Sequence, residues 1–249
     1  MNRFFRAVGT GLLAYCLALT SANANVIIAG TRVVFSANEG EVTLRLTNDN
    51  TTPALIEAWI DAGDPHSTPD KVTTPFLITP PLFRMEPHKD QSLRIIFSAG
   101  KQPLPTDRES LFWLNVLEIP PKPTGQEFVG KNYLQLAIRS RLKLFYRPAN
   151  LPGDANKTGN ELTFKATAAD KGYALVVHNP TPYFVTISQL TLSSGGQSIK
   201  VDGDMVAPMG DMTIAVPGLT HAPSAGSEVQ FDIINDYGAP APFKSTIAP

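Results

Sequence analysis

Two cationic residues stand inside otherwise apolar stretches of the chain. Arg32 lies in GTRVVF and Lys143 lies in RLKLFYR. A charge that is buried in this way must be paired, or its lost solvation must be replaced. One interpretation is that both side chains lie at strand edges and extend their charged ends to water. The other is that they form an anion site for a ligand carboxylate, and the two residues alone leave both open.

The remaining chemistry-bearing residues form no catalytic or metal-binding motif. The histidines are scattered through separate segments: His66, His88, His178 and His221. None has the spacing of a metal site, and the sequence has no GxSxG, P-loop or GxGxxG motif. Asp61 and Asp64 flank a turn, but DAGDPH offers too few oxygen ligands for a calcium loop. We therefore expect no enzymatic activity, no metal site and no cofactor.

The stretch 132–148, NYLQLAIRSRLKLFYRP, has a marked strand pattern and contains Lys143. Its apolar residues alternate with others, as in a β-strand with one apolar face: Leu134, Leu136 and Ile138. Basic residues follow at the same spacing, on the opposite face of a straight strand: Arg139, Arg141 and Lys143. On this pattern alone, an ordinary core strand explains the stretch equally well.

Short β-branched or aromatic runs alternate with polar turns through the rest of the chain after residue 25. In EVTLRLT, for example, Val42, Leu44 and Leu46 are expected to face a core, and Trp59 is expected to be a central core aromatic. Strands at this spacing predict an all-β protein built from sandwiches. The formal net charge of -1 gives no global basic field for nucleic acid.

A polar, proline- and glycine-bearing segment, RPANLPGDANKTGN (147–160), predicts a linker between two domains. We place the boundary at 148/149, so that residues 25–148 and 149–249 each form an immunoglobulin-like sandwich. Neither half has the Cys…Trp…Cys pattern of an antibody domain.

The first 24 residues have the pattern of a secretory signal peptide. Arg3 and Arg6 precede a short apolar run, and SANA predicts cleavage after Ala24. No later segment approaches the apolar length of a membrane span. The single cysteine, Cys16, lies in this segment, so the mature chain is expected to have no disulfide. We expect the protein to be exported.

Six segments form a wider pattern over most of the chain after residue 25. They are TRVVF (31–35), TPPLFRMEP (79–87), DRESLFWLNVLEIPP (107–121), LQLAIRSRLKLFYRP (134–148), NPTPYFVT (179–186) and NDYG (235–238). Together they resemble the periplasmic chaperones of chaperone–usher pilus assembly, the PapD-like proteins. The resemblance implies two immunoglobulin-like domains in a boomerang arrangement with a cleft between them.

The resemblance also implies how such a protein holds its partner. Arg32 and Lys143 match cleft residues that anchor the C-terminal carboxylate of a pilus subunit. Leu134, Leu136 and Ile138 match the donor strand, which fills the groove of a subunit that lacks its last strand. The protein would thus bind, fold and cap subunits, and then deliver them to an outer-membrane usher.

A charged trio matches residues that hold the two domains in orientation, a structural role: Glu109, Arg147 and Asp236. Two acids around one arginine leave an unequal charge, so further donors are expected there. The short segment between Pro121 and Leu134 resembles the branch of the family with a short loop before the donor strand. Arg139 and Arg141 are a departure whose role the sequence does not show.

The expected partners are therefore pilus subunits and an usher, with no nucleic acid. An exposed apolar edge also favours a self-capping homodimer of the free protein. The alternative is a secreted two-domain adhesin or structural pilus component. Two domains, no cysteine in the mature chain and a free edge strand speak against a subunit, while an exported enzyme would need a site that the sequence does not show.

Overall fold

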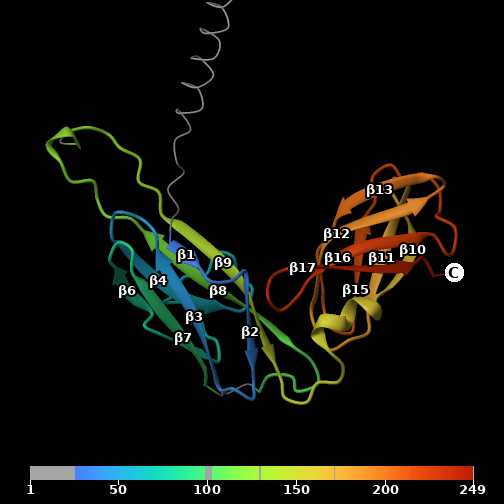
Figure 1. Ribbon diagram of the computed structural model, residues 1–249, viewed down its shortest axis with the longest axis horizontal. Helices are drawn as coiled ribbons and strands as arrows, with labels where there is room; N and C mark the ends of the chain where they lie inside the picture. Colours follow the sequence, from blue (N-terminus) through green and yellow to red (C-terminus); the bar gives the residue numbers. More distant parts are fainter. Residues whose placement is uncertain (1–25, 99–102, 129, 171, 249) are drawn as a thin grey trace, which may run out of the picture.

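The computed structural model describes residues 26–98, 103–128, 130–170 and 172–248. The expected signal peptide and its cleavage site lie outside the described residues. The chain forms two β-rich lobes with separate hydrophobic cores, one drawn from blue to green and one from orange to red (Figure 1). The predicted fold class, all-β with two sandwich domains, is confirmed. No helix among the described residues is long and apolar enough to cross a membrane.

The first lobe packs a four-stranded sheet against a five-stranded sheet. The four-stranded sheet has the order β1 (Val26–Ile28), β3 (Glu41–Asn48), β7 (Asp90–Phe97), β5 (Phe76–Thr79). The five-stranded sheet has the order β2 (Arg32–Ser36), β9 (Ile138–Arg147), β8 (Ser110–Ile119), β4 (Ala54–Asp61), β6 (Leu82–Met85). Between the sheets, Leu44 and Leu46 are buried and Val42 packs against them, as the alternation in β3 predicts.

Trp59 is buried, as predicted, but it lies outside this core and not at its centre. Its neighbours in β4, Ala58 and Ile60, point into the hydrophobic core, so Trp59 points to the outer face of the sheet. There its indole N–H donates to Ser67 Oγ at 3.2 Å, and the side chain is buried in the loop after β4. An apolar residue that is buried under a loop cannot be distinguished by sequence alone from one that is buried in the core of a sandwich.

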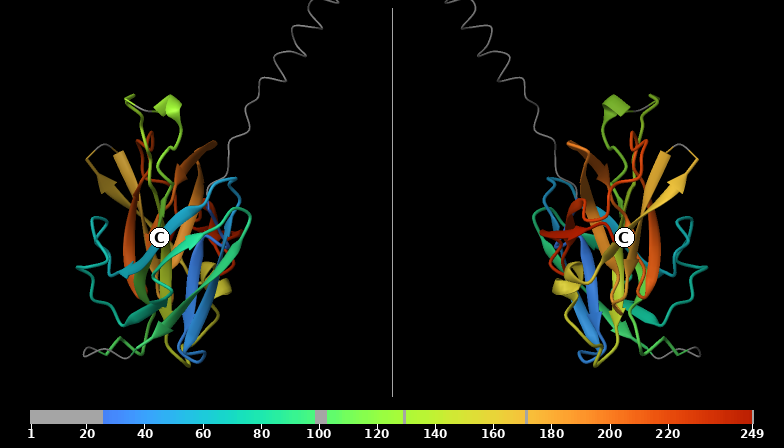
Figure 2. Two further views of the ribbon diagram at one scale, coloured as in Figure 1. Left: turned by 90° about the vertical axis from the view of Figure 1, so that its left-hand side faces the viewer. Right: turned by 90° about the vertical axis from the view of Figure 1, so that its right-hand side faces the viewer.

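The strand predicted from Asn132 begins only at Ile138. Pro120 and Pro121 follow the end of β8, whose last pair with β9 joins Glu118 and Ile138. Residues 131–137 therefore have no neighbouring strand in the described chain and no ladder to hold them extended. With the short helix η1 (Gln126–Phe128), this segment projects beyond the sandwich (Figures 1 and 2).

The second lobe pairs a three-stranded sheet with a larger sheet. The first has the order β10 (Thr163–Ala169), β11 (Gly172–Asn179), β15 (Gly210–Ala215). The second has the order β13 (Gln197–Asp202), β12 (Val185–Ser194), β16 (Glu228–Ile234), β17 (Pro240–Thr246), and β14 (Met205–Val206) also pairs with β12. The LSSGGQ turn joins β12 to β13, and both its glycines adopt positive φ, at 59° and 76°.

The two cores lie on either side of the segment 147–160, which contains the helix η2 (Ala155–Asn160). The first core ends in sequence at Leu144, with Tyr146 packed against it, and the second begins at Leu162. The long strand β9 thus leads directly from the projecting segment to the junction of the two lobes (Figure 1).

Candidate functional site: a paired cation site beside an open strand edge

Arg32 and Lys143 are direct neighbours in the five-stranded sheet. Strands β2 and β9 pair in parallel with Arg32 opposite Lys143, which places the two side chains on the same face. Arg32 Nη1 donates to the backbone oxygen of Ile234 at 2.9 Å, and Lys143 Nζ donates to Thr186 Oγ1 at 3.3 Å. Because Ile234 and Thr186 belong to the second lobe, the cation pair lies between the two lobes.

The pair has no carboxylate partner of its own. Among the described residues, neither Arg32 nor Lys143 forms an ion pair within 4.0 Å, although both are half-buried. The Arg32 Nε atom is buried without a hydrogen-bond partner. Burial lowers the pKa of both groups, and the charge of Arg32 lowers the pKa of Lys143 further. An anion placed here would relieve the repulsion and satisfy free donors, which suits a carboxylate.

The strand that carries Lys143 has an open edge next to this pair. Strand β8 pairs with β9 from Ile138 to Tyr146, whereas β2 pairs with β9 only from Lys143 onward. Residues 138–142 therefore present unpaired backbone groups on the side of β2 within the described chain. An added strand in line with β2 would complete the sheet there.

The apolar residues before this edge are exposed. Leu134 is 84% exposed, Leu136 65% and Ile138 44%. Of the three predicted donor residues, only Ile138 lies in β9, and the other two continue its direction as irregular chain. The structure thus leaves an alternating apolar ridge with no partner in the described chain.

The structure brings the charged trio together at the junction of the lobes. Arg147 Nε lies 2.7 Å from Glu109 Oε1, and its Nη1 and Nη2 atoms lie 2.7 and 2.9 Å from the two carboxylate oxygens of Asp236. The guanidinium also stacks over the Tyr183 ring, 5.1 Å from its centroid. The further donor expected for the unequal charge is the Phe184 N–H, 2.8 Å from Glu109 Oε2. Both acids thus connect the lobes, because Phe184 and Asp236 belong to the second.

Arg139 and Arg141 have partners that the sequence did not reveal. Arg141 Nη2 lies 2.6 Å from Asp61 Oδ1, and its guanidinium stacks 4.2 Å from the Trp113 ring centroid. Arg139 donates to the backbone oxygens of Pro65 and Ser67. The one signal in the sequence for these partners is Asp61, an acidic residue at the end of an apolar run. No three His, Cys, Asp or Glu side chains of the described segments gather as a metal site.

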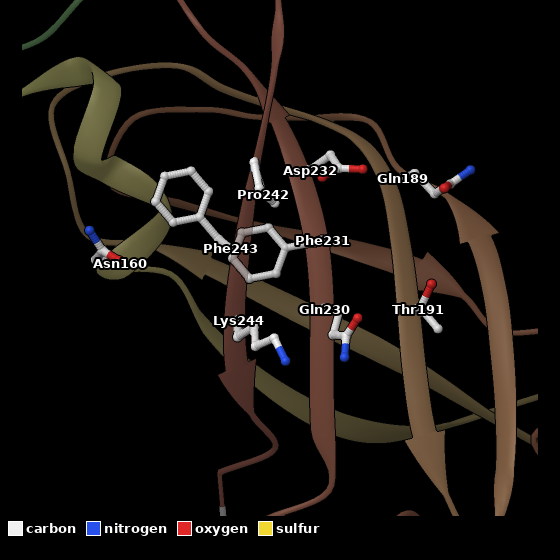
Figure 3. Close-up of a pocket in the computed structure, with 9 residues that line it drawn as sticks. All are labelled: Asn160, Gln189, Thr191, Gln230, Phe231, Asp232, Pro242, Phe243 and Lys244. Carbon is white, nitrogen blue, oxygen red and sulfur yellow. The ribbon is translucent and has the colours of Figure 1, made fainter.

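A hollow of about 670 Å³ lies away from these residues, in the second lobe. Figure 3 shows its lining residues on β12, β16 and β17 and at the end of η2: Asn160, Gln189, Thr191, Gln230, Phe231, Asp232, Pro242, Phe243 and Lys244. It contains none of the residues that the sequence predicted as a site.

Two family models cover nearly all of the described chain. Residues 25–152 match the pili and flagellar-assembly chaperone, PapD N-terminal domain, and residues 157–245 match the pili assembly chaperone PapD, C-terminal domain. The chain is 41% identical over 254 residues, with full coverage of both sequences, to the chaperone protein FimB/FhaD of Bordetella pertussis.

Solved structures agree with these matches. The crystal structure of the YadV chaperone, a probable fimbrial chaperone of Escherichia coli, superimposes with a TM-score of 0.76 at 35% identity, over 90% of this chain and 100% of that one. The SafB chaperone in complex with the SafA pilin of Salmonella enterica superimposes with a TM-score of 0.71 at 29% identity, over 92% of this chain and 99% of that one.

A two-lobed β fold with a cation pair between its lobes and an open, apolar strand edge defines a binding protein for extended chains. The chain belongs to the PapD-like pili assembly chaperones. It is therefore a chaperone of fimbrial assembly, as the sequence motifs predicted, and the alternative of an adhesin or structural pilus component is not supported.

Proposed function

We propose that this chaperone holds pilus subunits in the periplasm by donor-strand complementation. The observation that carries the proposal is the half-buried Arg32–Lys143 pair, which lacks a carboxylate partner and lies beside the open edge of β9. The C-terminal carboxylate of a subunit would bind between the two cations through charge-assisted hydrogen bonds. This contact uses the C-terminal carboxylate, which every protein chain has, so it suits a chaperone that serves several subunits.

The subunit's last strand would then extend from the anchor along the open edge of β9. Residues 138–142 offer the backbone hydrogen bonds, and the segment before them would become ordered as a strand on binding. Leu134, Leu136 and Ile138 would enter successive pockets of the subunit's groove. Burial of these three side chains contributes on the order of 5–8 kcal/mol before the costs of association.

The other parts of the molecule support this binding mode. The Glu109–Arg147–Asp236 ion pairs would fix the angle between domains 25–148 and 149–249, and with it the shape of the anchor site. Residues 1–24 would direct export and then be removed. The chaperone would act by binding alone, without catalysis or a cofactor, and would pass its subunit to an outer-membrane usher. When free, it would cap its own apolar ridge by forming a homodimer.

The test is co-expression with candidate pilus subunits, followed by purification of periplasmic complexes. A 1:1 complex is expected with wild type, and Lys143→Ala or Arg32→Ala should weaken it about ten- to hundredfold, the effect of losing one charge-assisted contact. Lys71→Ala, which removes a cation on the loop after β4, serves as the matched control and should bind as wild type does. Unchanged binding by folded Lys143→Ala and Arg32→Ala would rule out the carboxylate anchor.

A further inference from the structure

The face of β9 that carries Lys143 holds three cations at two-residue spacing: Arg139, Arg141 and Lys143. This spacing creates an ambiguity for any strand that adds to β9. Sliding by one residue would turn its apolar side chains to the wrong face, but sliding by two keeps every side chain on its face. The alternation of Leu134, Leu136 and Ile138 therefore does not exclude a shift of two residues, or about 6.8 Å. In that shifted position a subunit carboxylate would meet Arg141 in place of Lys143.

Arg141 is already occupied in the structure. Asp61, at the end of β4, is 1% exposed and accepts hydrogen bonds from Arg141 Nη2 at 2.6 Å and from Arg141 Nε at 3.3 Å. The flat face of the Arg141 guanidinium also stacks on the Trp113 ring, which holds the group in place. An incoming carboxylate would have to displace a buried carboxylate that is better placed than itself.

The Asp61 carboxylate is itself held by several donors. Asn115 Nδ2 donates at 2.8 Å, the Gly63 N–H at 2.7 Å and Ser67 Oγ at 3.1 Å. Burial acts to raise the pKa of Asp61, but the hydrogen bonds from Arg141, Asn115 and Gly63 lower it below its usual value. The group therefore stays charged at neutral pH and keeps Arg141 neutralised.

Arg139 is engaged by the same loop. Its guanidinium donates to the backbone oxygens of Pro65 and Ser67 and lies 5.7 Å from the centroid of the Trp59 ring. Of the three cations in the row, only Lys143 has neither a carboxylate nor a backbone oxygen as partner among the described contacts, and only Lys143 has Arg32 beside it.

We propose that the segment Asp61–Ser67 is a register mask: it occupies Arg141 and Arg139, so that a subunit carboxylate finds open donors at Lys143 and at Arg32, whose Nε has no partner although its Nη1 donates to Ile234. The inference rests on the proposed function and adds a specificity-determining role for Asp61. The apolar ridge determines which face of the added strand carries its apolar side chains, and the cation pair binds the C-terminal carboxylate of that strand. The register mask prevents the carboxylate from binding at Arg141 instead. Asp61 does this without contact to the subunit, so it is a positioning residue.

Cysteine cross-linking reports the register directly. The chain has no cysteine after Cys16, so Gln135→Cys introduces a single thiol beside the donor residues. The probe is the subunit that forms a 1:1 complex in the co-expression test, with cysteines placed one at a time along its last strand. A disulfide requires Cα atoms no more than about 7 Å apart, so a shift of two residues moves the reactive position.

With wild-type Asp61, one subunit position should cross-link strongly. In Asp61→Asn, a second cross-link two residues away is expected, because Arg141 loses its counter-charge. Arg141→Met should leave the wild-type pattern unchanged and should abolish the second cross-link when it is combined with Asp61→Asn. Asp61→Asn should also restore binding to Lys143→Ala by roughly tenfold or more, since Arg141 becomes a substitute anchor. A purely structural role for Asp61 would not produce this rescue.

The failures of the two proposals are distinguishable. If Lys143→Ala binds as tightly as wild type, the anchor itself is wrong. If Lys143→Ala fails to bind but Asp61→Asn gives a single, unshifted cross-link and no rescue, the anchor stands and the register mask is wrong. Tryptophan fluorescence verifies folding, because both tryptophans flank this site. If Asp61→Asn does not fold, Asp61→Ser removes the same counter-charge with a smaller polar side chain, and the same second cross-link is required of it.

Discussion

Replacement of Arg147 by methionine tests the charged junction between the lobes. Glu109 is 4% exposed, and Arg147 supplies its only counter-charge within 4.0 Å among the described residues. In Arg147→Met, the backbone N–H of Phe184 would remain as the one hydrogen-bond donor to the buried Glu109 carboxylate among the described contacts. An uncompensated buried charge costs about 3–5 kcal/mol, so the free energy of unfolding should fall by that amount at neutral pH. Asp236→Asn should cost only about 1–2 kcal/mol, because Arg147 keeps Glu109 and is partly exposed to water.

The effect should depend on pH with a defined sign. Burial raises the pKa of Glu109 above 4.5, against the opposing effects of Arg147 and the Phe184 amide. A group with a raised pKa in the folded state contributes its full stability below the unfolded pKa and loses it as the pH rises through the folded pKa. Without Arg147 this pKa rises further, so the deficit of Arg147→Met should be largest at neutral pH and should shrink on acidification toward pH 4.5.

Urea unfolding followed by tryptophan fluorescence measures this deficit in the first lobe. Both tryptophans, Trp59 and Trp113, belong to that lobe, so the signal is not mixed with unfolding of the second. A free energy of unfolding of Arg147→Met within about 0.5 kcal/mol of wild type at neutral pH, the range of an ordinary surface substitution, would refute the cost assigned to the buried Glu109 charge. A large deficit that does not change with pH would refute the assignment of the cost to the Glu109 charge.

Further predictions concern the ridge, the anchor and the second lobe. Leu134→Asp should abolish subunit binding in a pull-down assay while the free energy of unfolding stays within about 0.5 kcal/mol of wild type, since the side chain is 84% exposed; a stability loss above 2 kcal/mol would contradict the exposed ridge. Because burial and Arg32 lower the pKa of Lys143, subunit affinity should decline as the pH rises, at a lower pH than for an ordinary lysine. Lys143→Arg should abolish that decline, and an identical pH profile would disprove the role of the amine. Gly172 has a φ of +94°, and the Cβ of an alanine there would lie 2.2 Å from the Leu219 carbonyl oxygen. Gly172→Ala should therefore lower the free energy of unfolding of the second lobe by more than about 1 kcal/mol, as measured by thermal unfolding followed by circular dichroism. Gly40→Ala should cost less, because its new Cβ would meet nothing within 4 Å.

The fold class and the family could be predicted from local patterns in the sequence. Alternating apolar residues, as in β3, and turn residues such as Gly195 and Gly196 are local signals, because a strand's period of two and a positive φ depend on the residues themselves. The apolar neighbourhood of Arg32 and Lys143 made both cations conspicuous in the sequence, but it left open whether they form an anion site or extend their charges to water. The resemblance to pilus chaperones added Glu109, Arg147 and Asp236, which the structure brings into contact.

Where a local pattern fails to predict the structure, the reason lies in contacts between distant parts of the folded chain. Residues 132–137 have the alternation of a strand, but a strand requires a neighbour, and β8 ends before it could supply one. Trp59 and Asp61 alternate with core residues, yet a loop buries them on the opposite face of the sheet. The pairing of Asp61 with Arg141 joins residues 80 positions apart, and no spacing in the sequence encodes such a contact. Arg141 is neutralised by this contact, whereas Arg32 and Lys143 have no carboxylate partner among the described residues. The sequence could not show this difference, because the electrostatic energy of a charge depends on all of its neighbours in the folded chain.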